Sequence, residues 1–370
     1  MSRGTIRLTM AQALVRYLAA QRTMIEGREV SLCAGMFAIF GHGNVAAMGE
    51  ALAAARTELP TYRAHNEQAM AHAAIAYAKA LHRQRFMACT TSIGPGATNM
   101  VTAAALAHVN RLPVLLLPGD TFASRRPDPV LQQVEDFADP TITANDCFPP
   151  VSRYWDRIVR PEQLLRTLPQ ALGVLIDPAE CGPVTLALSQ DVQAESYDYP
   201  VSFFEPRLHR VAHPGADLRQ LAAAASAIAE ARQPIIIAGG GVLYADACTE
   251  LADFASRHEI PVAETQAGKG ALRWDHPQNV GAIGVTGSSA ANELAARADV
   301  IIAIGTRLQD FTTASGSLFR NPERRIIAIN VCRLDAAKYD ALSVQGDARR
   351  TLHELDALLK SSSDRKGWGA

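Results

Sequence analysis

The sequence predicts an α/β protein with two doubly wound parallel-sheet domains, and three observations support this fold class. Between residues 9 and 190, short apolar runs alternate with longer alanine-rich stretches. This alternation then stops and resumes from Ala216. Strands that are apolar on both faces and separated by helices are typical of a parallel sheet covered on both sides. A length of 370 residues, 48% of them hydrophobic, also suffices for two or three domains with separate cores.

The first domain is expected to cover residues 1–194. It opens on an amphipathic helix from Leu8 to Ala20 that Thr9 can cap. Apolar runs and helical stretches then follow one another in the order of a doubly wound sheet. The expected strands are 30–34, 86–91, 113–117 and 183–188, and the expected helices are 44–56, 66–82, 97–110 and 161–176.

An interdomain linker is expected over residues 195–215, because this segment has three prolines, four aromatic residues and no helical period. A second α/β domain then covers residues 216–360. Its expected helices are 216–231, 245–258, 287–297 and 348–360, and its expected strands are 234–238, 261–265, 300–305 and 325–330. The polar stretch 361–370 is interpreted as an exit linker or a frayed end.

The charge balance favours a small-molecule partner. Lysine and arginine total 36 against 37 acidic residues, so nothing in the charge favours nucleic acid or an acidic membrane surface. No uninterrupted apolar stretch reaches the roughly 18 residues of a membrane span. The six cysteines lie far apart, without the short spacing of a zinc site, so no metal ligand is assigned. Such cysteine usage indicates a reducing compartment, and we expect the cytoplasm.

Glu67 opens an alanine-rich helix that Asn66 can cap. Alanines on nearly every face predict a helix that is closely packed on all sides. A carboxylate in its first turn is favoured by the helix dipole and disfavoured by an apolar environment, so it can act as a proton donor and acceptor. The alternative is an ordinary first-turn glutamate that only complements the dipole.

Two glycine-rich turns follow predicted strands. In TTSIGPGATN, Gly94 and Gly96 flank Pro95 and form a rigid turn with room for a flat ring, although a plain strand-to-helix connection is an alternative. In AGMFAIFGHGN, His42 lies between two glycines. This histidine is either a substrate ligand or proton carrier, or a hydrogen-bonding surface group.

The second domain carries an incomplete dinucleotide fingerprint. GGGV at 239–242 follows a strand, but Tyr244 occupies the position of the last glycine. Glu264 ends the next strand near where a ribose-binding acid would lie, so nucleotide binding stays open. A P-loop, an H-E-x-x-H motif, a G-x-S-x-G elbow and a kinase signature are all absent from the sequence.

Together, these motifs resemble those of thiamine-diphosphate enzymes. The order of Glu67, GPGATN and PVLLLPGD resembles their pyrimidine-binding domain, and GTRLQDF at 305–311 resembles the central Rossmann-like domain of the acetohydroxyacid synthase and pyruvate oxidase group. Within this superfamily the chain is most similar to the trihydroxycyclohexane-1,2-dione hydrolases of inositol catabolism. That resemblance covers nearly the whole chain and includes AGMFAIFGHGN, YRAHNEQAMAHAAIAYAKA, FASRRPDPVLQQ, TANDCF and VSRYWDRI.

The resemblance implies an enzyme that opens a cyclic dione by hydrolysis of a carbon–carbon bond and releases a deoxy-glucuronic acid. Glu67 would share a proton with the aminopyrimidine ring of the cofactor, and the cofactor would supply the reactive carbon. The remaining implied residues are His42, Asn44 and His65 for substrate contacts, Gly94, Gly96 and Asn99 beside the cofactor, and Gln132 or Gln133 as the match of a glutamine in relatives.

The sequence departs from this family in one respect. Family members hold magnesium and the diphosphate with a Gly-Asp-Gly motif in a third domain, whereas the Gly-Asp pairs here, Gly119-Asp120 and Gly346-Asp347, lack the second glycine. We therefore expect that a third domain is missing, that these residues alone bind cofactor and magnesium weakly and are inactive, and that the alanine-rich helix favours a homodimer or higher oligomer. The alternatives are a flavin-carrying acetohydroxyacid synthase or decarboxylase relative, and a non-catalytic two-domain remnant that binds a nucleotide or an assembly partner.

Overall fold

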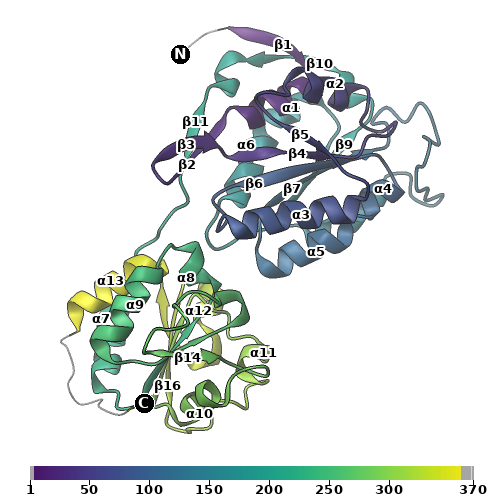
Figure 1. Ribbon diagram of the computed structural model, residues 1–370. Helices are drawn as coiled ribbons and strands as arrows, with labels where there is room; N and C mark the ends of the chain where they lie inside the picture. Colours follow the sequence, from purple (N-terminus) through teal and green to yellow (C-terminus); the bar gives the residue numbers. More distant parts are fainter. Residues whose placement is uncertain (1–3, 360–367, 369–370) are drawn as a thin grey trace. The chain divides into compact units, whose positions relative to one another are not determined.

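The computed structural model describes residues 4–359 and residue 368. The chain divides into two compact units, Met1–Val211 and Ala212–Ala370. Each unit contains a six-stranded parallel sheet with helices on both faces, so the predicted fold class is confirmed (Figure 1). Among the described residues, no helix combines the length and the apolar character that crossing a membrane requires.

The first unit is built on the sheet order β5-β4-β6-β7-β9-β8, in which all neighbouring strands run parallel. Every residue of β6, β7 and β9 is buried, as expected for strands covered on both faces. The strands are β5 (Thr61–Arg63), β4 (Cys33–Ala38), β6 (Phe86–Thr91), β7 (Val114–Asp120), β9 (Pro183–Ser189) and β8 (Tyr154–Ile158).

Helices cover both faces of this sheet. On one face, α3 (Glu67–Ala80) and α5 (Val101–Asn110) lie side by side, and α4 (Pro95–Thr98) leads into α5 (Figure 1). On the other face, α1 (Met10–Ala19), α2 (Ala47–Ala54) and α6 (Leu164–Leu175) bury their apolar sides against the strands. Thr9 caps α1 as predicted, in a capping box with Gln12.

The expected strand 30–34 is wrong, because the chain changes sheets within it. Residues Arg28–Ser31 form β3, which pairs antiparallel with β2 (Gln21–Ile25), and the parallel sheet takes Cys33–Ala38 instead. Only Ser31 interrupts the apolar residues at the change, and one small polar residue did not indicate a break between two strands. The half-buried strand β8 and the three-residue β5 were also missed.

Most of the expected linker 195–215 is instead structured within the first unit. Its strand β10 (Ser196–Pro200) pairs with β1 (Thr5–Thr9), and β11 (Arg207–His209) pairs with β2. Phe203 stacks on Tyr17 with ring centroids 4.5 Å apart. The aromatic residues that suggested a linker therefore contribute to the core, because they bury large rings against α1.

The second unit has the sheet order β14-β13-β12-β15-β16-β17, again all parallel. Its strands are β14 (Asn279–Ala282), β13 (Val262–Glu264), β12 (Pro234–Ala238), β15 (Val300–Ile304), β16 (Arg325–Asn330) and β17 (Leu342–Gln345). Its helices are α7 (Leu218–Glu230), α8 (Gly240–Tyr244), α9 (Cys248–His258), α10 (Ser289–Arg297), α11 (Asp310–Thr313), α12 (Arg333–Ala336) and α13 (Ala348–Leu358).

Helices α7, α9 and α13 pack together on one face of this second sheet, and α10 covers the other face. The sequence did not predict β14 and β17, which are short strands at the two edges of the sheet. The expected exit linker 361–370 lies outside the described residues except for Trp368, whose indole N–H donates to the carbonyl oxygen of Pro234 at 2.6 Å.

Candidate functional site

The candidate site lies at the carboxyl edge of the first sheet. Because parallel strands end at one edge, the loops that follow them converge there. His42 follows β4, His65 follows β5 and Gly94 follows β6. The structure therefore brings the predicted residues to one side of the domain, although they are spread along 58 positions of sequence from His42 to Asn99.

Glu67 is the first residue of α3, and the Asn66 side chain caps the helix by accepting the Ala69 N–H at 2.9 Å. The Asn99 side-chain amide donates to Oε2 of Glu67 at 2.8 Å. This bond fixes the orientation of the half-buried carboxylate. Asn99, which the sequence predicted beside the cofactor, contacts Glu67 directly.

The helix that Glu67 opens is buried on one face only, so the expectation of close packing on all sides is wrong for the single chain. Its buried face consists of Met70, Ala71, Ala74, Ile75 and Ala78. On the opposite face, Ala69, Ala73, Ala76 and Ala80 are exposed. Alanine has no long side chain to reveal which face points inward, and its periodicity was therefore uninformative.

The two glycines of the GPGATN turn are required by close approaches. Gly94 has φ +66°, and a Cβ there would overlap the carbonyl oxygen of Gln132. A Cβ on Gly96 would lie 2.9 Å from Oγ1 of Thr91 and 3.3 Å from Oε1 of Glu67. The turn thus places no side chain from position 96 against Oε1 of Glu67 or against the buried Thr91 hydroxyl, which has no hydrogen-bond partner.

The loop that carries His42 is shaped by Asn44. The buried amide of Asn44 accepts the Gly41 N–H at 2.9 Å and donates to the Ile39 carbonyl at 3.1 Å and to Oγ1 of Thr90 at 3.2 Å. These bonds give Asn44 a structural contribution besides its predicted substrate contact. His42 is half-buried, and its Nε2 atom is buried without a hydrogen-bond partner.

The other predicted polar residues differ in exposure. His65 is exposed in the turn between β5 and α3, two positions before Glu67. Gln133 shapes its own loop by accepting the Val130 N–H at 2.9 Å. Gln132 is exposed, and its carbonyl oxygen lies over Gly94. Of the two candidate glutamines, Gln132 is therefore the one in contact with the turn beside Glu67.

Sequence reasoning missed a buried ion pair that anchors the segment after β7. Arg157 donates to Oδ2 of the fully buried Asp120 at 2.8 Å and to Oδ2 of Asp146 at 2.7 Å. Burial opposes the charge on Arg157, but these bonds raise its pKa above the ordinary value. The available signal was an aspartate at the end of an entirely apolar strand, which needs a partner when buried.

Asp191 binds the start of the segment that follows β7. Its carboxylate accepts the N–H groups of Ala123 at 2.9 Å and Ser124 at 3.0 Å. Burial alone would raise the pKa of Asp191, but the bonds from these backbone groups outweigh it and lower that pKa below its ordinary value. The segment 121–143 is thus attached to the sheet edge at its start by Asp191 and near its end by Arg157 through Thr143.

The carboxyl edge of the second sheet is arranged differently. The Gly241 N–H donates to the Gly305 carbonyl at 2.9 Å, and a Cβ on Gly305 would lie 2.5 Å from the Cα of Gly241. Oε1 of Glu264 accepts the N–H groups of Gly270 and Leu272, each at 3.0 Å. The glycines and the acid that suggested a nucleotide site therefore bind the unit's own loops.

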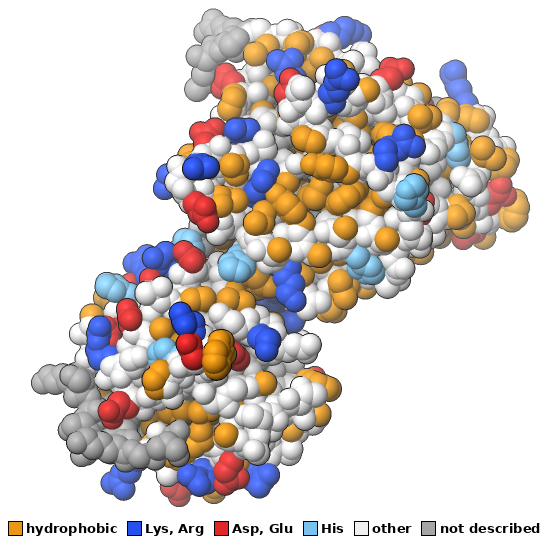
Figure 2. Space-filling view, viewed as in Figure 1, with side chains coloured by type: hydrophobic (Ala, Val, Ile, Leu, Met, Phe, Trp, Pro, Cys, Tyr) orange, Lys and Arg blue, Asp and Glu red, His pale blue; other side chains and the backbone are white. Residues whose placement is uncertain are grey.

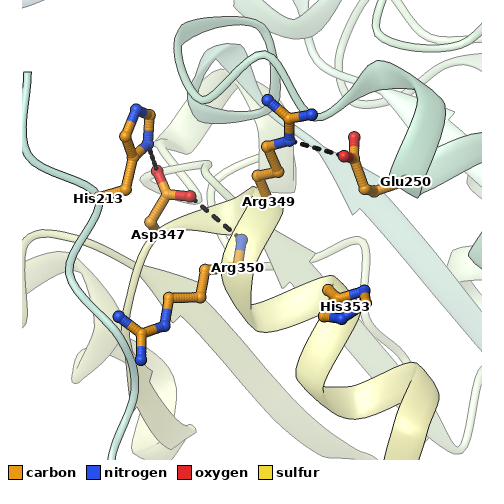
Figure 3. A pocket seen from close by; sticks show the side chains of 6 residues that line it. All are labelled: His213, Glu250, Asp347, Arg349, Arg350 and His353. Carbon is orange, nitrogen blue, oxygen red and sulfur yellow. Dashed lines mark hydrogen bonds and ion pairs between the residues drawn. The ribbon is translucent and has the colours of Figure 1, made fainter.

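A hollow of about 370 Å³ in the second unit is lined by His213, Glu250, Asp347, Arg349, Arg350 and His353 (Figure 3). Arg349 donates to Glu250 at 2.6 Å, Arg350 donates to Glu354 at 2.9 Å, and Asp347 bonds His213 at 3.0 Å. Among the residues that the structure describes, no group of three or more His, Cys, Asp or Glu side chains could hold a metal ion.

Comparison with known proteins identifies both units. Residues 34–139 match the N-terminal TPP binding domain of thiamine pyrophosphate enzymes, and residues 221–355 match their central domain. The chain belongs to the thiamine pyrophosphate enzymes. Glu67, Asn99 and the GPGATN turn lie in the matched N-terminal domain of this family, and the closed glycine edge lies in the matched central domain.

Similar curated thiamine pyrophosphate enzymes are named 3D-(3,5/4)-trihydroxycyclohexane-1,2-dione hydrolase. The one from Clostridium perfringens is 51% identical over 358 residues, which are 97% of this chain and 56% of the relative. One from Bacillus cereus and one from Bacillus anthracis are each 51% identical over 351 residues, or 95% of this chain and 54% of the relative. The chain thus spans slightly more than half the length of these relatives.

Proposed function

We propose that this chain is part of a thiamine-diphosphate-dependent hydrolase that cleaves a carbon–carbon bond in a cyclic 1,2-dione and yields a deoxy-glucuronic acid in inositol catabolism. The relatives named for trihydroxycyclohexane-1,2-dione support the substrate class, since they align over 97% of the chain. The single observation that carries the proposal is the close approach of Gly96, which has no side chain, to Oε1 of Glu67.

The residues at this edge fit the aminopyrimidine half of the cofactor. A flat ring needs a gap without side chains and a carboxylate at its rim, and Gly96 and Glu67 supply these. Any larger residue at position 96 would fill the gap, because its Cβ would lie 3.3 Å from Oε1 of Glu67. The buried Thr91 hydroxyl beside this gap has no protein partner and is available to a ligand.

Thiamine diphosphate, when bound, supplies a nucleophilic carbon that adds to carbonyl groups. The part of this chain in the reaction is proton transfer and orientation. Glu67 holds and releases a proton at Oε1, while the Asn99 amide keeps Oε2 engaged and the carboxylate in one orientation. His42 and His65 contact the hydroxyl and carbonyl groups of the dione, and Asn44 holds the His42 loop.

Magnesium and the diphosphate require oxygen ligands that these residues do not gather. Since the described residues include no group suited to a metal ion, we expect the 370-residue chain alone to bind thiamine diphosphate weakly and to be inactive. The relatives are longer, and we propose that the diphosphate and magnesium bind in the portion of the relatives that this chain does not span.

We also propose that the intact enzyme is a homodimer or a higher oligomer. Exposed apolar side chains gather on the first unit (Figure 2), where α3 exposes Ala69, Ala73 and Ala76 and the neighbouring α5 exposes Leu106 and Val109. Contiguous apolar surface of this kind is typical of subunit contacts. A cytoplasmic location is proposed because the six cysteines, all within the described residues, form no disulfide bond.

The test uses a chain extended to the length of the relatives, with magnesium, thiamine diphosphate and the trihydroxycyclohexanedione. Glu67→Gln is expected to lower the turnover number about 100-fold or more, because it removes the proton-transferring group. The matched control is Glu50→Gln, which changes an exposed glutamate in the first turn of α2 and should retain wild-type turnover. Full activity of Glu67→Gln would reject the proposal.

A further inference from the structure

Two successive carbonyl groups in the His42 loop are bound from one turn far away in sequence. The Gln190 side-chain amide donates to the carbonyl oxygen of His42 at 2.8 Å. The Gln193 side-chain amide donates to the carbonyl oxygen of Gly43 at 2.8 Å and to that of Leu188 at 3.1 Å. Both glutamines follow β9, which is separated from the His42 loop by about 150 residues and lies at the same sheet edge.

The binding of this loop is extensive for a surface turn. Gln193 is only 1% exposed, and both of its N–H donors are used. From a second direction, Oγ of Ser92 accepts the Gly43 N–H at 3.3 Å. From a third, β7 approaches so closely that a Cβ on Gly119 would lie 2.9 Å from the Gly43 carbonyl. The backbone at His42 and Gly43 therefore has little freedom to move.

The backbone carbonyl of His42 is hydrogen-bonded, but its imidazole ring is not bonded at Nε2. Its Nε2 atom is buried and has no hydrogen-bond partner, although a buried polar atom is normally bonded. A free loop would relax by turning such a ring toward water or toward a partner. The glutamine bonds oppose this relaxation, because they fix the two peptide units that follow the Cα atom of His42, through the carbonyl oxygens of His42 and Gly43. An imidazole nitrogen held without a protein partner is available to a ligand.

We infer that Gln190 and Gln193 are positioning residues that hold the His42 imidazole ready for substrate at the carboxyl edge of the first sheet. This inference deepens the proposed function and rests on it for its catalytic part. A bound dione has several hydroxyl and carbonyl groups, and a fixed imidazole selects among their positions better than a mobile one. The two glutamines do not touch the substrate and act only through His42.

The first experiment tests the bonds in the 370-residue chain by hydrogen exchange and mass spectrometry. Gln193→Met and Gln190→Met keep the side-chain length and remove the amide donor. We expect amide exchange over residues 41–45 to accelerate on the order of fivefold, since one net hydrogen bond is worth about 1 kcal/mol. Two variants are used because Gln193 is buried and Gln190 only partly so.

The matched control for this experiment is Gln163→Met. Gln163 also binds a turn after a parallel strand, since its Oε1 accepts the Val159 N–H at 2.7 Å. This variant should leave exchange over residues 41–45 unchanged. Unchanged exchange there in both the Gln190 and the Gln193 variant would overturn the inference at the structural level.

The second experiment is a double-mutant cycle in the extended, cofactor-loaded enzyme. Gln193→Met should lower the turnover number several-fold in the wild-type background and have no further effect on His42→Ala, because Gln193 acts through His42. An equal loss of turnover number in both backgrounds would show that Gln193 only stabilises the fold in general, and it would overturn the inference. Glu67→Gln serves as the reference: if it is fully active, the proposed function fails, whereas an inactive Glu67→Gln with an uncoupled Gln193 rejects only this inference.

Discussion

The carboxyl edges of the two sheets share a strand arrangement and differ in what occupies them. At the first edge, several buried polar atoms have no protein partner, among them Nε2 of His42, Oγ1 of Thr91, Oδ1 of Asn145 and Oε1 of Gln190. At the second edge, loop backbones contact one another through glycines, as at Gly241 and Gly305. The first edge therefore has buried polar atoms that a ligand can bond. At the second edge, the glycines let the loop backbones pack directly against one another.

Glycine motifs therefore do not identify a ligand site until their contacts are known. Gly96 and Gly305 both follow buried strands, and both are intolerant of a Cβ. Next to Gly96 lies a carboxylate oxygen, whereas next to Gly305 lies the backbone of another loop. Glycine thus leaves space beside a carboxylate at the first edge and allows two loop backbones to touch at the second. Four predictions test this difference.

The largest effect is expected from Gly305→Ala. A Cβ there would lie 2.5 Å from Gly241 Cα at φ +60°, and we expect a loss of about 3 kcal/mol in the free energy of unfolding. The control is Gly270→Ala, also in the second unit at φ +90° but with open space around the position, which should lose only about 1 kcal/mol. Urea denaturation followed by circular dichroism measures the free energy of unfolding of both variants. Equal losses would contradict the close contact of Gly305 with Gly241.

The next effect concerns the open edge. Asn99→Ala removes the amide that donates to Oε2 of Glu67, so the carboxylate loses its fixed orientation. The turnover number of the extended enzyme should fall about tenfold, the consequence of losing roughly 1.4 kcal/mol. Thr98→Ala, which loses only a local bond to the Pro95 carbonyl, should behave as wild type. Equal activities of the two variants would show that Asn99 has no special relation to Glu67.

A smaller effect is expected at Asp191. Because its folded pKa is lowered, the carboxylate stabilises the fold at pH above the unfolded value of about 3.9, and this contribution is lost as the pH falls through the folded pKa. Asp191→Asn should therefore be less stable than wild type by about 1 kcal/mol at pH 7, and the difference should shrink in acid. Urea denaturation at pH 7 and pH 3 gives both values. A difference that grows toward acid would reverse the assigned sign.

The smallest effect is expected from adding a nucleotide. Since Oε1 of Glu264 accepts the N–H groups of both Gly270 and Leu272, the carboxylate is held against the unit's own loop, and we expect it not to bind a ribose at the second edge. Flavin adenine dinucleotide at 100 µM, roughly a hundredfold above a micromolar dissociation constant, should not shift the melting temperature. A clear stabilisation that Glu264→Ala abolishes would show that this edge opens.

The sequence allowed the fold class and the position of Glu67 to be predicted, because buried parallel strands and a capped helix leave local patterns. Asn66 caps α3 as its residue type suggests. The roles of Gln190 and Gln193 left no such pattern, since their partners lie about 150 positions away. The aromatics of 195–215 were misread for the same reason: Phe203 packs on Tyr17, and a local window contains only one of the two rings.

The segment 121–143 is attached at its start by Asp191 and near its end by the bond from Arg157 to Thr143, while Phe137 between them is 96% exposed. Between these fixed ends the segment also contacts the GPGATN turn, because the carbonyl oxygen of Gln132 lies over Gly94. Substitutions at exposed positions such as Phe137 are therefore expected to leave the sheet intact, whereas the backbone at Gln132 has to keep its place. Differences between related enzymes are expected to be tolerated best at such exposed positions, beside a sheet edge whose backbone contacts have to stay constant.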